Sequence, residues 1–111
     1  MKWSDLDNDA CPVARTLAIV GDRWTLLILR DGFLGATKFE EFALSVGATR
    51  HVIADRLKRL VEAGLMEKRA YSKRPTRYEY VLTERGRELG PALIVFRDWG
   101  RKYLNVRRPA G

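Results

Sequence analysis

Residues 48–65 read ATRHVIADRLKRLVEAGL, and the rest of the chain is organised around this stretch. Its apolar residues recur at helical spacing, which predicts one amphipathic helix; they are Ile53, Leu57, Leu60 and Val61. Thr49 is expected to cap the start of this helix, and Gly64 to end it at positive φ. The opposite face is polar and mostly basic, which suits insertion into the DNA major groove. An ordinary solvated helix face is the alternative.

The composition is that of one small globular domain. The chain has 111 residues, of which 46% are apolar and 32% charged. No apolar run could span a membrane, and the opening MKWSDLDNDA lacks the apolar stretch of a secretion signal, so we expect a cytoplasmic protein. The single cysteine, Cys11, excludes an internal disulfide framework and fits a reducing compartment.

The net charge of +7 is unevenly distributed along the chain. Residues 1–48 hold five basic and seven acidic side chains, a balance of −2. Residues 49–77 hold nine basic and three acidic side chains, a balance of +6. Residues 78–111 hold seven basic and four acidic side chains, a balance of +3. If the positive charge served only solubility, we would expect it to be spread more evenly along the chain. This concentration is typical of a protein with a polyanionic partner.

Three helices are predicted before the central stretch. The first covers residues 12–20 and is opened by a proline, and the second covers residues 23–33 and is capped by an aspartate. The second is apolar on most sides and is expected to be the buried central helix. A short helix over residues 38–45, capped by Thr37, leads through a Gly-containing turn into the helix over residues 49–63. Together these last two form a helix-turn-helix pattern.

After the basic helix, the periodicity becomes that of strands. Residues 65–71 and 77–82 are predicted to pair as a β-hairpin, joined by a turn over residues 72–76 in which Pro75 disfavours a helix. A surface hairpin with charged tips is one interpretation. Because it follows a basic helix-turn-helix directly and has a Lys-Arg tip, we interpret it as the wing of a winged helix.

Thr83 is expected to cap a last helix that reaches Tyr103 and that Gly90-Pro91 should bend or split in two. Its far half carries more aromatic surface than one small domain readily covers, so we expect a dimer interface and not a helix folded back onto its own core. The interface residues are expected in the two terminal elements, residues 1–20 and 84–105. They are Trp3, Leu6, Val13, Leu17, Leu93, Ile94, Phe96, Trp99 and Tyr103.

In this order, the segments resemble the HxlR-type regulators, a branch of the MarR-like winged helix-turn-helix transcription factors. The matching pieces include CPV at 11–13, GDRW at 21–24, KFEEF at 38–42, RLKRL at 56–60 and LTERG at 82–86. No single piece is very specific, but the set covers nearly the whole chain. The resemblance implies a homodimer built from the first and last helices that binds a pseudo-palindromic operator in double-stranded DNA, most often as a repressor.

We therefore predict a mainly α-helical fold with a small β-hairpin (α+β). One winged helix-turn-helix domain would occupy residues 1–111, with its DNA-binding part at residues 37–82. The chain departs from the family at Ala54, where many members carry Ser or Thr, and in its opening Thr49-Arg50-His51.

The candidate DNA contacts fall into three groups. Those at or near base edges, from the helix over 49–63, are Thr49, Arg50, His51, Ala54, Asp55 and Lys58. Those suited to phosphates, at the sides of that helix and at the start of the preceding one, are Thr37, Lys38, Arg56 and Arg59. Those on the wing, at phosphates or in the minor groove, are Lys73, Arg74 and Arg77.

Cys11 is a second candidate site. It directly precedes Pro12, so its sulfur is expected at a helix N-terminus, where the helix dipole favours a thiolate. In several relatives the matching cysteine senses oxidants or electrophiles, which the resemblance suggests here. With one cysteine per chain, oxidation would give a disulfide between two Cys11 of a dimer, a mixed disulfide with a small thiol, or an adduct. The alternative is a structural thiol that fills a gap at the dimer interface.

The sequence argues against an enzyme. It has no glycine-rich phosphate loop, no metal-ligand cluster and no pairing of a nucleophile with a base, so neither cofactor nor metal is expected. A winged helix that binds protein instead of DNA is the other rival, but it would have little need for the +6 segment. A small-molecule effector between the DNA-binding and dimer helices would fit the resemblance, although no residue pattern identifies one.

Overall fold

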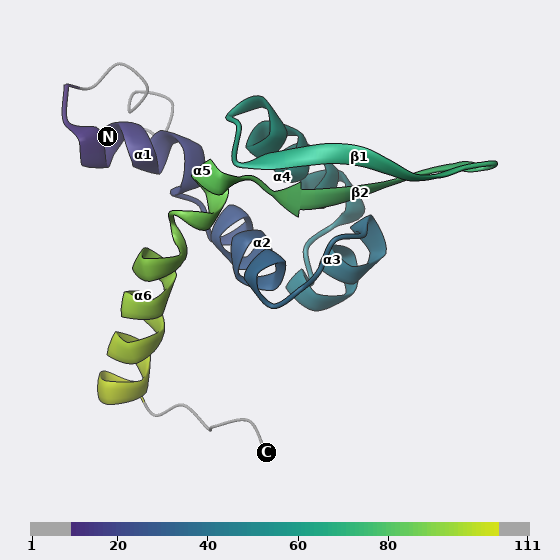
Figure 1. Ribbon diagram of the computed structural model, residues 1–111. Helices are drawn as coiled ribbons and strands as arrows, with labels where there is room; N and C mark the ends of the chain where they lie inside the picture. Colours follow the sequence, from purple (N-terminus) through teal and green to yellow (C-terminus); the bar gives the residue numbers. More distant parts are fainter. Residues whose placement is uncertain (1–9, 105–111) are drawn as a thin grey trace.

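The computed structural model describes residues 10–104, which form a mainly helical body and a long β-hairpin (Figure 1). In chain order the elements are α1 (Pro12–Val20), α2 (Arg23–Phe33), α3 (Phe39–Val46), α4 (Arg50–Glu62), β1 (Met66–Lys73), β2 (Thr76–Leu82), α5 (Glu84–Arg87) and α6 (Gly90–Tyr103). This arrangement confirms the predicted α+β class. The proposed interface residues Trp3 and Leu6 lie outside the described residues.

The core lies where α2 meets α3 and α4, and the base of the hairpin closes it. Each of these elements contributes side chains with almost no solvent exposure: Ile28, Leu29, Phe42, Ile53, Leu57, Leu60 and Met66. The apolar stripe of α4 is therefore buried as predicted, and α2 is the central helix. Because the stripe faces inward, the polar side of α4 is turned to solvent.

Most predicted helix ends are confirmed. The hydroxyl of Thr49 accepts a hydrogen bond from the Val52 N–H (3.2 Å) at the start of α4. After α4, Gly64 has a φ of 80°, a left-handed conformation that glycine adopts without steric cost. The predicted interruption at Gly90-Pro91 is also present, since α5 ends at Arg87 and α6 begins at Gly90.

The prediction that Thr37 caps α3 is wrong. The capping position belongs to Lys38, and the helix begins one residue later than expected. The Glu41 carboxylate accepts hydrogen bonds from the backbone N–H groups of Lys38 (2.9 Å) and Thr37 (3.3 Å). A carboxylate in the first helical turn thus accepts from the backbone N–H groups just before α3, in place of the expected cap by the threonine hydroxyl.

The hairpin is longer than predicted, because the strands extend into the expected turn. Its register runs from Met66 opposite Leu82 to Lys73 opposite Thr76, which leaves only Arg74 and Pro75, joined by a cis peptide bond, at the tip. The hairpin projects well beyond the helical body (Figure 1).

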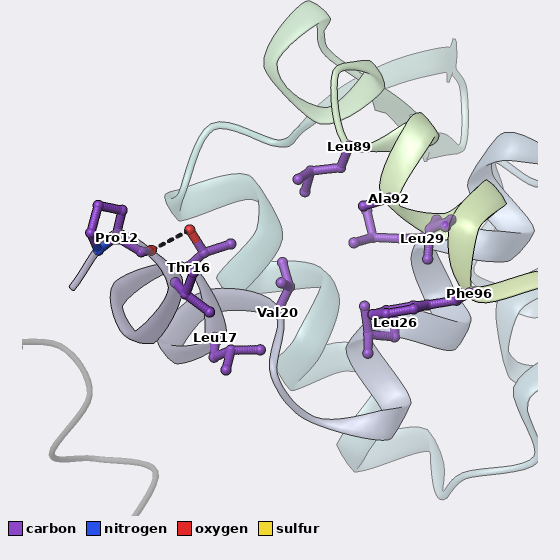
Figure 2. Close-up of a pocket in the computed structure, with 11 residues that line it drawn as sticks. Pro12, Thr16, Leu17, Val20, Leu26, Leu29, Leu89, Ala92 and Phe96 are labelled. Atoms are coloured by element: carbon purple, nitrogen blue, oxygen red, sulfur yellow. Dashed lines mark hydrogen bonds between the residues drawn. The ribbon is translucent and has the colours of Figure 1, made fainter. Parts of the chain in front are cut away.

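The terminal helices α1 and α6 lie at the other side of the molecule from the hairpin, and α6 extends away from the body (Figure 1). Leu93 near the start of α6 packs against the core, but no residue of α6 is buried, so the helix does not fold back wholly onto its own core. Between α1, α2 and the start of α6 lies an open apolar groove of about 370 Å³ (Figure 2). Within residues 10–104, no helix is both long and apolar enough to cross a membrane.

Candidate nucleic-acid interface

The polar face of α4 carries a group of solvent-exposed candidates from the predicted set. His51, Ala54 and Lys58 are exposed on this face, opposite the buried stripe. Lys58 also lies 4.0 Å from Glu62, one turn further along the same face. Arg59 is only partly exposed, as expected for a residue at the side of the helix.

Arg50 differs from its exposed neighbours because its guanidinium is already engaged. It makes two hydrogen bonds to the Glu40 carboxylate of α3 (2.7 and 3.0 Å) and lies over the Phe39 ring, 4.8 Å from its centroid. The hydrogen bond from Arg50 lowers the pKa of Glu40, so this pair is ionised near neutral pH. The first turn of α4 is thereby tied to the first turn of α3 while the pair remains open to solvent.

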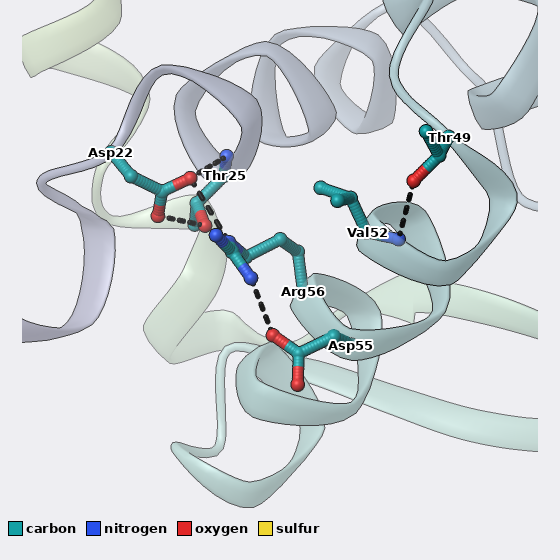
Figure 3. Close-up of polar contacts among 6 residues, drawn as sticks. All are labelled: Asp22, Thr25, Thr49, Val52, Asp55 and Arg56. Atoms are coloured by element: carbon teal, nitrogen blue, oxygen red, sulfur yellow. Dashed lines mark hydrogen bonds and ion pairs between the residues drawn. The ribbon is translucent and has the colours of Figure 1, made fainter.

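Arg56, which we expected at a phosphate, lies in a different environment. Its Nε is 3.1 Å from Oδ1 of Asp22, and its other side bonds to the Asp55 carboxylate (Figure 3). The Arg56 side chain is only 19% exposed. A guanidinium shared by two carboxylates has little positive potential left for a phosphate. The phosphate contact stays a prediction, and the structure gives this guanidinium two protein partners. Asp55 is turned partly toward Arg56.

At the start of α3, where a phosphate site was expected, the backbone amides already have an acceptor within the protein. The backbone N–H groups of Thr37 and Lys38 already donate to Glu41, and the bond from Lys38 lowers the pKa of that carboxyl. These amides are not available to an anion in this arrangement. The ammonium of Lys38 lies 4.9 Å from the centroid of the Tyr71 ring on β1, so it links α3 to the hairpin.

The three wing candidates, Lys73, Arg74 and Arg77, are exposed at the far end of the hairpin. The base of the hairpin is anchored by a hydrogen bond of 2.6 Å from the Tyr80 N–H to the Thr37 carbonyl oxygen. The basic tip therefore projects from a fixed base, on the same side of the molecule as α3 and α4 (Figure 1).

Two acidic residues at this surface were not identified as site residues from the sequence. Judged from the local sequence, Glu40 is a favourable charge at the start of a helix and Asp22 is a helix cap. Each does have that local role, but each also binds an arginine of α4 that lies ten or more residues away along the chain. No local pattern signals such a pair.

The candidates for dimerisation share the opposite side of the molecule. Val13, Leu17, Ile94, Phe96, Trp99 and Tyr103 are exposed, and Leu93 is partly buried. Several of them line the groove between α1 and α6 (Figure 2). Cys11 occupies the N-cap position of α1, as predicted, and is exposed. Among the described residues, no group of three or more His, Cys, Asp or Glu is placed to hold a metal ion.

Comparison with known proteins gives a consistent result. The sequence model of the family described as HxlR-like helix-turn-helix matches residues 19–108. The chain is 48% identical to the HTH-type transcriptional regulator Rv3095 of Mycobacterium tuberculosis (strain ATCC 25618 / H37Rv), over 100% of this chain and 70% of that protein.

Two solved structures extend this likeness to the fold. The crystal structure of PA1607, assigned as a transcription factor, is 41% identical with a TM-score of 0.85, over 96% of this chain and 75% of that one. The redox regulator HypR in its oxidized form is 30% identical with a TM-score of 0.79, over 86% of this chain and 100% of that one.

Proposed function

This chain belongs to the HxlR-like helix-turn-helix family of DNA-binding transcriptional regulators, and we propose that it is a homodimer that reads a pseudo-palindromic operator and represses transcription. The observation that carries the proposal is the exposed polar face of α4, held outward by its buried stripe. We call α4 the recognition helix from here on. An exposed helix of this kind is what the major groove of B-DNA admits.

The contacts we propose follow from how far each side chain is exposed to solvent. His51, Ala54 and Lys58 face base edges from the recognition helix, and Thr49, Arg50 and Asp55 lie beside them. Lys38 and Arg59 approach phosphates from the sides. The exposed wing cations Lys73, Arg74 and Arg77 contact the backbone or enter the minor groove. We omit Arg56, because its side chain is only 19% exposed and its guanidinium lies between two carboxylates, whereas Arg50 is 67% exposed beside its carboxylate partner. We also omit the amide groups of Thr37 and Lys38, because both donate to Glu41.

The proposed partner of the terminal helices is a second copy of the chain. Phe96, Trp99 and Tyr103 expose aromatic surface on α6 beside the apolar groove, more than an isolated small domain usually leaves in water. A two-fold symmetric pair that buries this surface would place its recognition helices in successive major grooves, about 34–36 Å apart. The operator should then consist of two inverted half-sites.

The test is selection from a randomised DNA duplex library with the purified protein, followed by fluorescence anisotropy on the selected duplex. We expect inverted half-sites with centres about 10–10.5 bp apart and binding that weakens steeply with salt. Enrichment of no sequence would contradict sequence-specific reading. Transcription in vitro from a promoter that contains the selected site should fall when protein is added, and a rise would replace repression with activation.

A thiol-based response at Cys11 is a second candidate function. The similarity to the redox regulator HypR and the exposed position of Cys11 at the N-cap of α1 support it. A two-electron oxidant such as diamide would take two electrons and two protons from two thiols and leave a disulfide, either between two Cys11 or with a small thiol.

Because Cys11 is the only cysteine, the test has a clean control. We expect diamide to change the affinity of the wild type for the selected duplex and to leave Cys11→Ser unaffected. Equal effects on both proteins, or none on either, would exclude the thiol response and favour a structural role for Cys11.

A further inference from the structure

Asp22 is a rigidly held carboxylate between α1 and α2. Its Oδ1 accepts a hydrogen bond from the Thr25 N–H (3.1 Å) and its Oδ2 one from the Thr25 hydroxyl (2.6 Å), while Thr25 itself is buried. The turn before Asp22 is tightly packed. The Gly21 N–H donates to the Leu17 carbonyl oxygen, and a Cβ at Gly21 would lie 2.3 Å from that oxygen. A side chain that binds the Asp22 carboxylate is therefore anchored to both α1 and α2.

Arg56 of the recognition helix binds the Asp22 carboxylate (Figure 3). The side chains of Asp22 and Arg56 are 18% and 19% exposed. Burial raises the pKa of Asp22, but the hydrogen bonds from Thr25 and Arg56 outweigh that effect and leave the pKa lowered. Asp22 is therefore ionised at neutral pH. Removal of either partner would leave a poorly solvated charge, which is costly.

The position of Arg56 on the recognition helix gives the pair its significance. The stripe of Ile53, Leu57 and Leu60 that docks this helix is apolar, and apolar contact is non-directional, so it holds the rotation of the helix about its axis less sharply than hydrogen bonds do. At about 100° per residue, Arg50 and Arg56 lie roughly 60° to either side of this stripe. Arg50 is tied to Glu40 of α3, and Arg56 to Asp22 at the start of α2.

A rotation of the recognition helix would displace the side chains that face DNA. For a side-chain tip about 5–6 Å from the helix axis, a turn of about 20° is a shift of roughly 2 Å. Hydrogen bonds do not tolerate displacements of this size. We propose that Asp22 and Arg56 are positioning residues that fix the rotation of the recognition helix, and that Arg56 itself makes no DNA contact. This proposal rests on the proposed function, in which that helix reads base edges.

Two single variants with opposite charge changes test the proposal. Asp22→Asn keeps a good N-cap residue but removes the charge that holds Arg56, and Arg56→Gln removes the other partner. We expect both to raise the Kd for the selected duplex about tenfold or more, the equivalent of one misplaced base contact. Binding to an unselected duplex should change much less. If only net charge mattered, Asp22→Asn would bind DNA more tightly and Arg56→Gln more weakly, which would overturn the proposal.

The salt dependence of binding separates a positioning role from a phosphate contact. Arg74→Gln on the wing makes the same chemical change as Arg56→Gln and serves as the comparison. We expect Arg74→Gln to flatten the slope of log Kd against log salt concentration, and Arg56→Gln to leave it unchanged. An equal loss of slope in both variants would make Arg56 a phosphate contact and overturn the proposal. Arg56→Lys keeps the charge without the planar fork and should show an intermediate loss of specific affinity.

A measurement without DNA keeps this proposal distinct from the proposed function. Denaturant unfolding of the wild type, Asp22→Asn, Arg56→Gln and the double variant forms a thermodynamic cycle. We expect the double variant to lose less stability than the two single losses added together. An additive result would show that the pair does not form in solution and would overturn the proposal. If the wild type selected no duplex, the proposed function would fail and the DNA-reading role with it, while the cycle would still report on the pair.

Discussion

At the scale of single residues, the basic side chains of the recognition helix are distinguished by their partners. Arg50 lies against Glu40 and Phe39, Arg56 is held between two carboxylates, and Lys58 is exposed near Glu62. A guanidinium binds a carboxylate and a phosphate with the same planar donors, so the local sequence does not distinguish these roles.

Arg50→Ala should relax base preference at one position of each half-site. A bidentate arginine contact to guanine discriminates by about 1–3 kcal/mol, and Arg50 is an exposed arginine at the start of the recognition helix. The measurement is anisotropy on duplexes substituted one base pair at a time. Arg101→Ala, which removes an exposed cation from α6, is the control and should leave the profile unchanged. An unchanged profile for Arg50→Ala would remove Arg50 from the base-reading residues.

Asp22→Asn should weaken the acid sensitivity of the fold. The pKa of Asp22 in the folded protein lies below its ordinary value of 3.8, so its ionised form stabilises the protein at neutral pH. That contribution is lost as the pH falls below 3.8 through the folded-state pKa, because the proton then binds more readily to the unfolded chain. We expect Asp22→Asn to cost about 1–2 kcal/mol at pH 7.

Denaturant unfolding between about pH 7 and about pH 2 measures this difference. The stability of the wild type should approach that of Asp22→Asn as Asp22 protonates. The other acidic residues titrate in both proteins, so their contributions largely cancel. Parallel stability curves over this whole range would mean that Asp22 is not held in its ionised form by Arg56 and Thr25.

At the scale of elements, helices were easier to anticipate than the contacts between them. The bounds of α1 and α2 agree with the predicted ranges, because a proline, an aspartate cap and the apolar spacing all act within a few residues. The start of α3 was misplaced because the N-cap position lies at Lys38, whose backbone N–H donates to Glu41, and not at Thr37. The hairpin was predicted too short because pairing with the opposite strand extends β1 and β2 into residues whose composition favours a turn.

Lys73→Ala and Arg74→Ala should weaken binding to all DNA sequences alike. A phosphate contact carries no base information, and each one removed lowers the salt slope by about 0.9, so a symmetric dimer should lose roughly 1.8 per substitution. Arg101→Ala, the same kind of change on α6, should leave the slope unaltered. A wing variant that altered base preference without altering the slope would place the tip in the minor groove as a reader of sequence.

At the scale of the whole molecule, basic and apolar surfaces are segregated. The recognition helix and the hairpin tip lie at one side, while the groove and the aromatic face of α6 lie at the other (Figures 1 and 2). The Asp22–Arg56 pair lies between them, since Asp22 follows α1 directly and Arg56 belongs to α4. This arrangement would let a second copy cover the apolar side without obstructing the DNA-facing side.

Phe96→Glu should dissociate the proposed dimer. A charge buried against the aromatic face should raise the dimer dissociation constant at least about 30-fold, as for a hot-spot residue. Light scattering across a dilution series measures the state of assembly, and affinity for the two-half-site duplex should fall with it, because the half-sites are no longer bound by linked subunits. Arg101→Glu lies on the opposite face of α6 and is the control. A dimer that persists in Phe96→Glu would place the interface elsewhere.

The sequence by itself determined the class of the fold, the order of its elements and the stripe that buries the recognition helix, because these depend on periodicity, caps and turns within a few residues. Concentration of positive charge also indicated a polyanionic partner from the sequence alone. Only the tertiary structure decided which charges remain available: it joins Asp22 to Arg56 and Glu40 to Arg50, and it engages the backbone amides of Thr37 and Lys38 just before α3. Such pairs depend on how helices pack, and packing distances are not encoded in spacing along the chain.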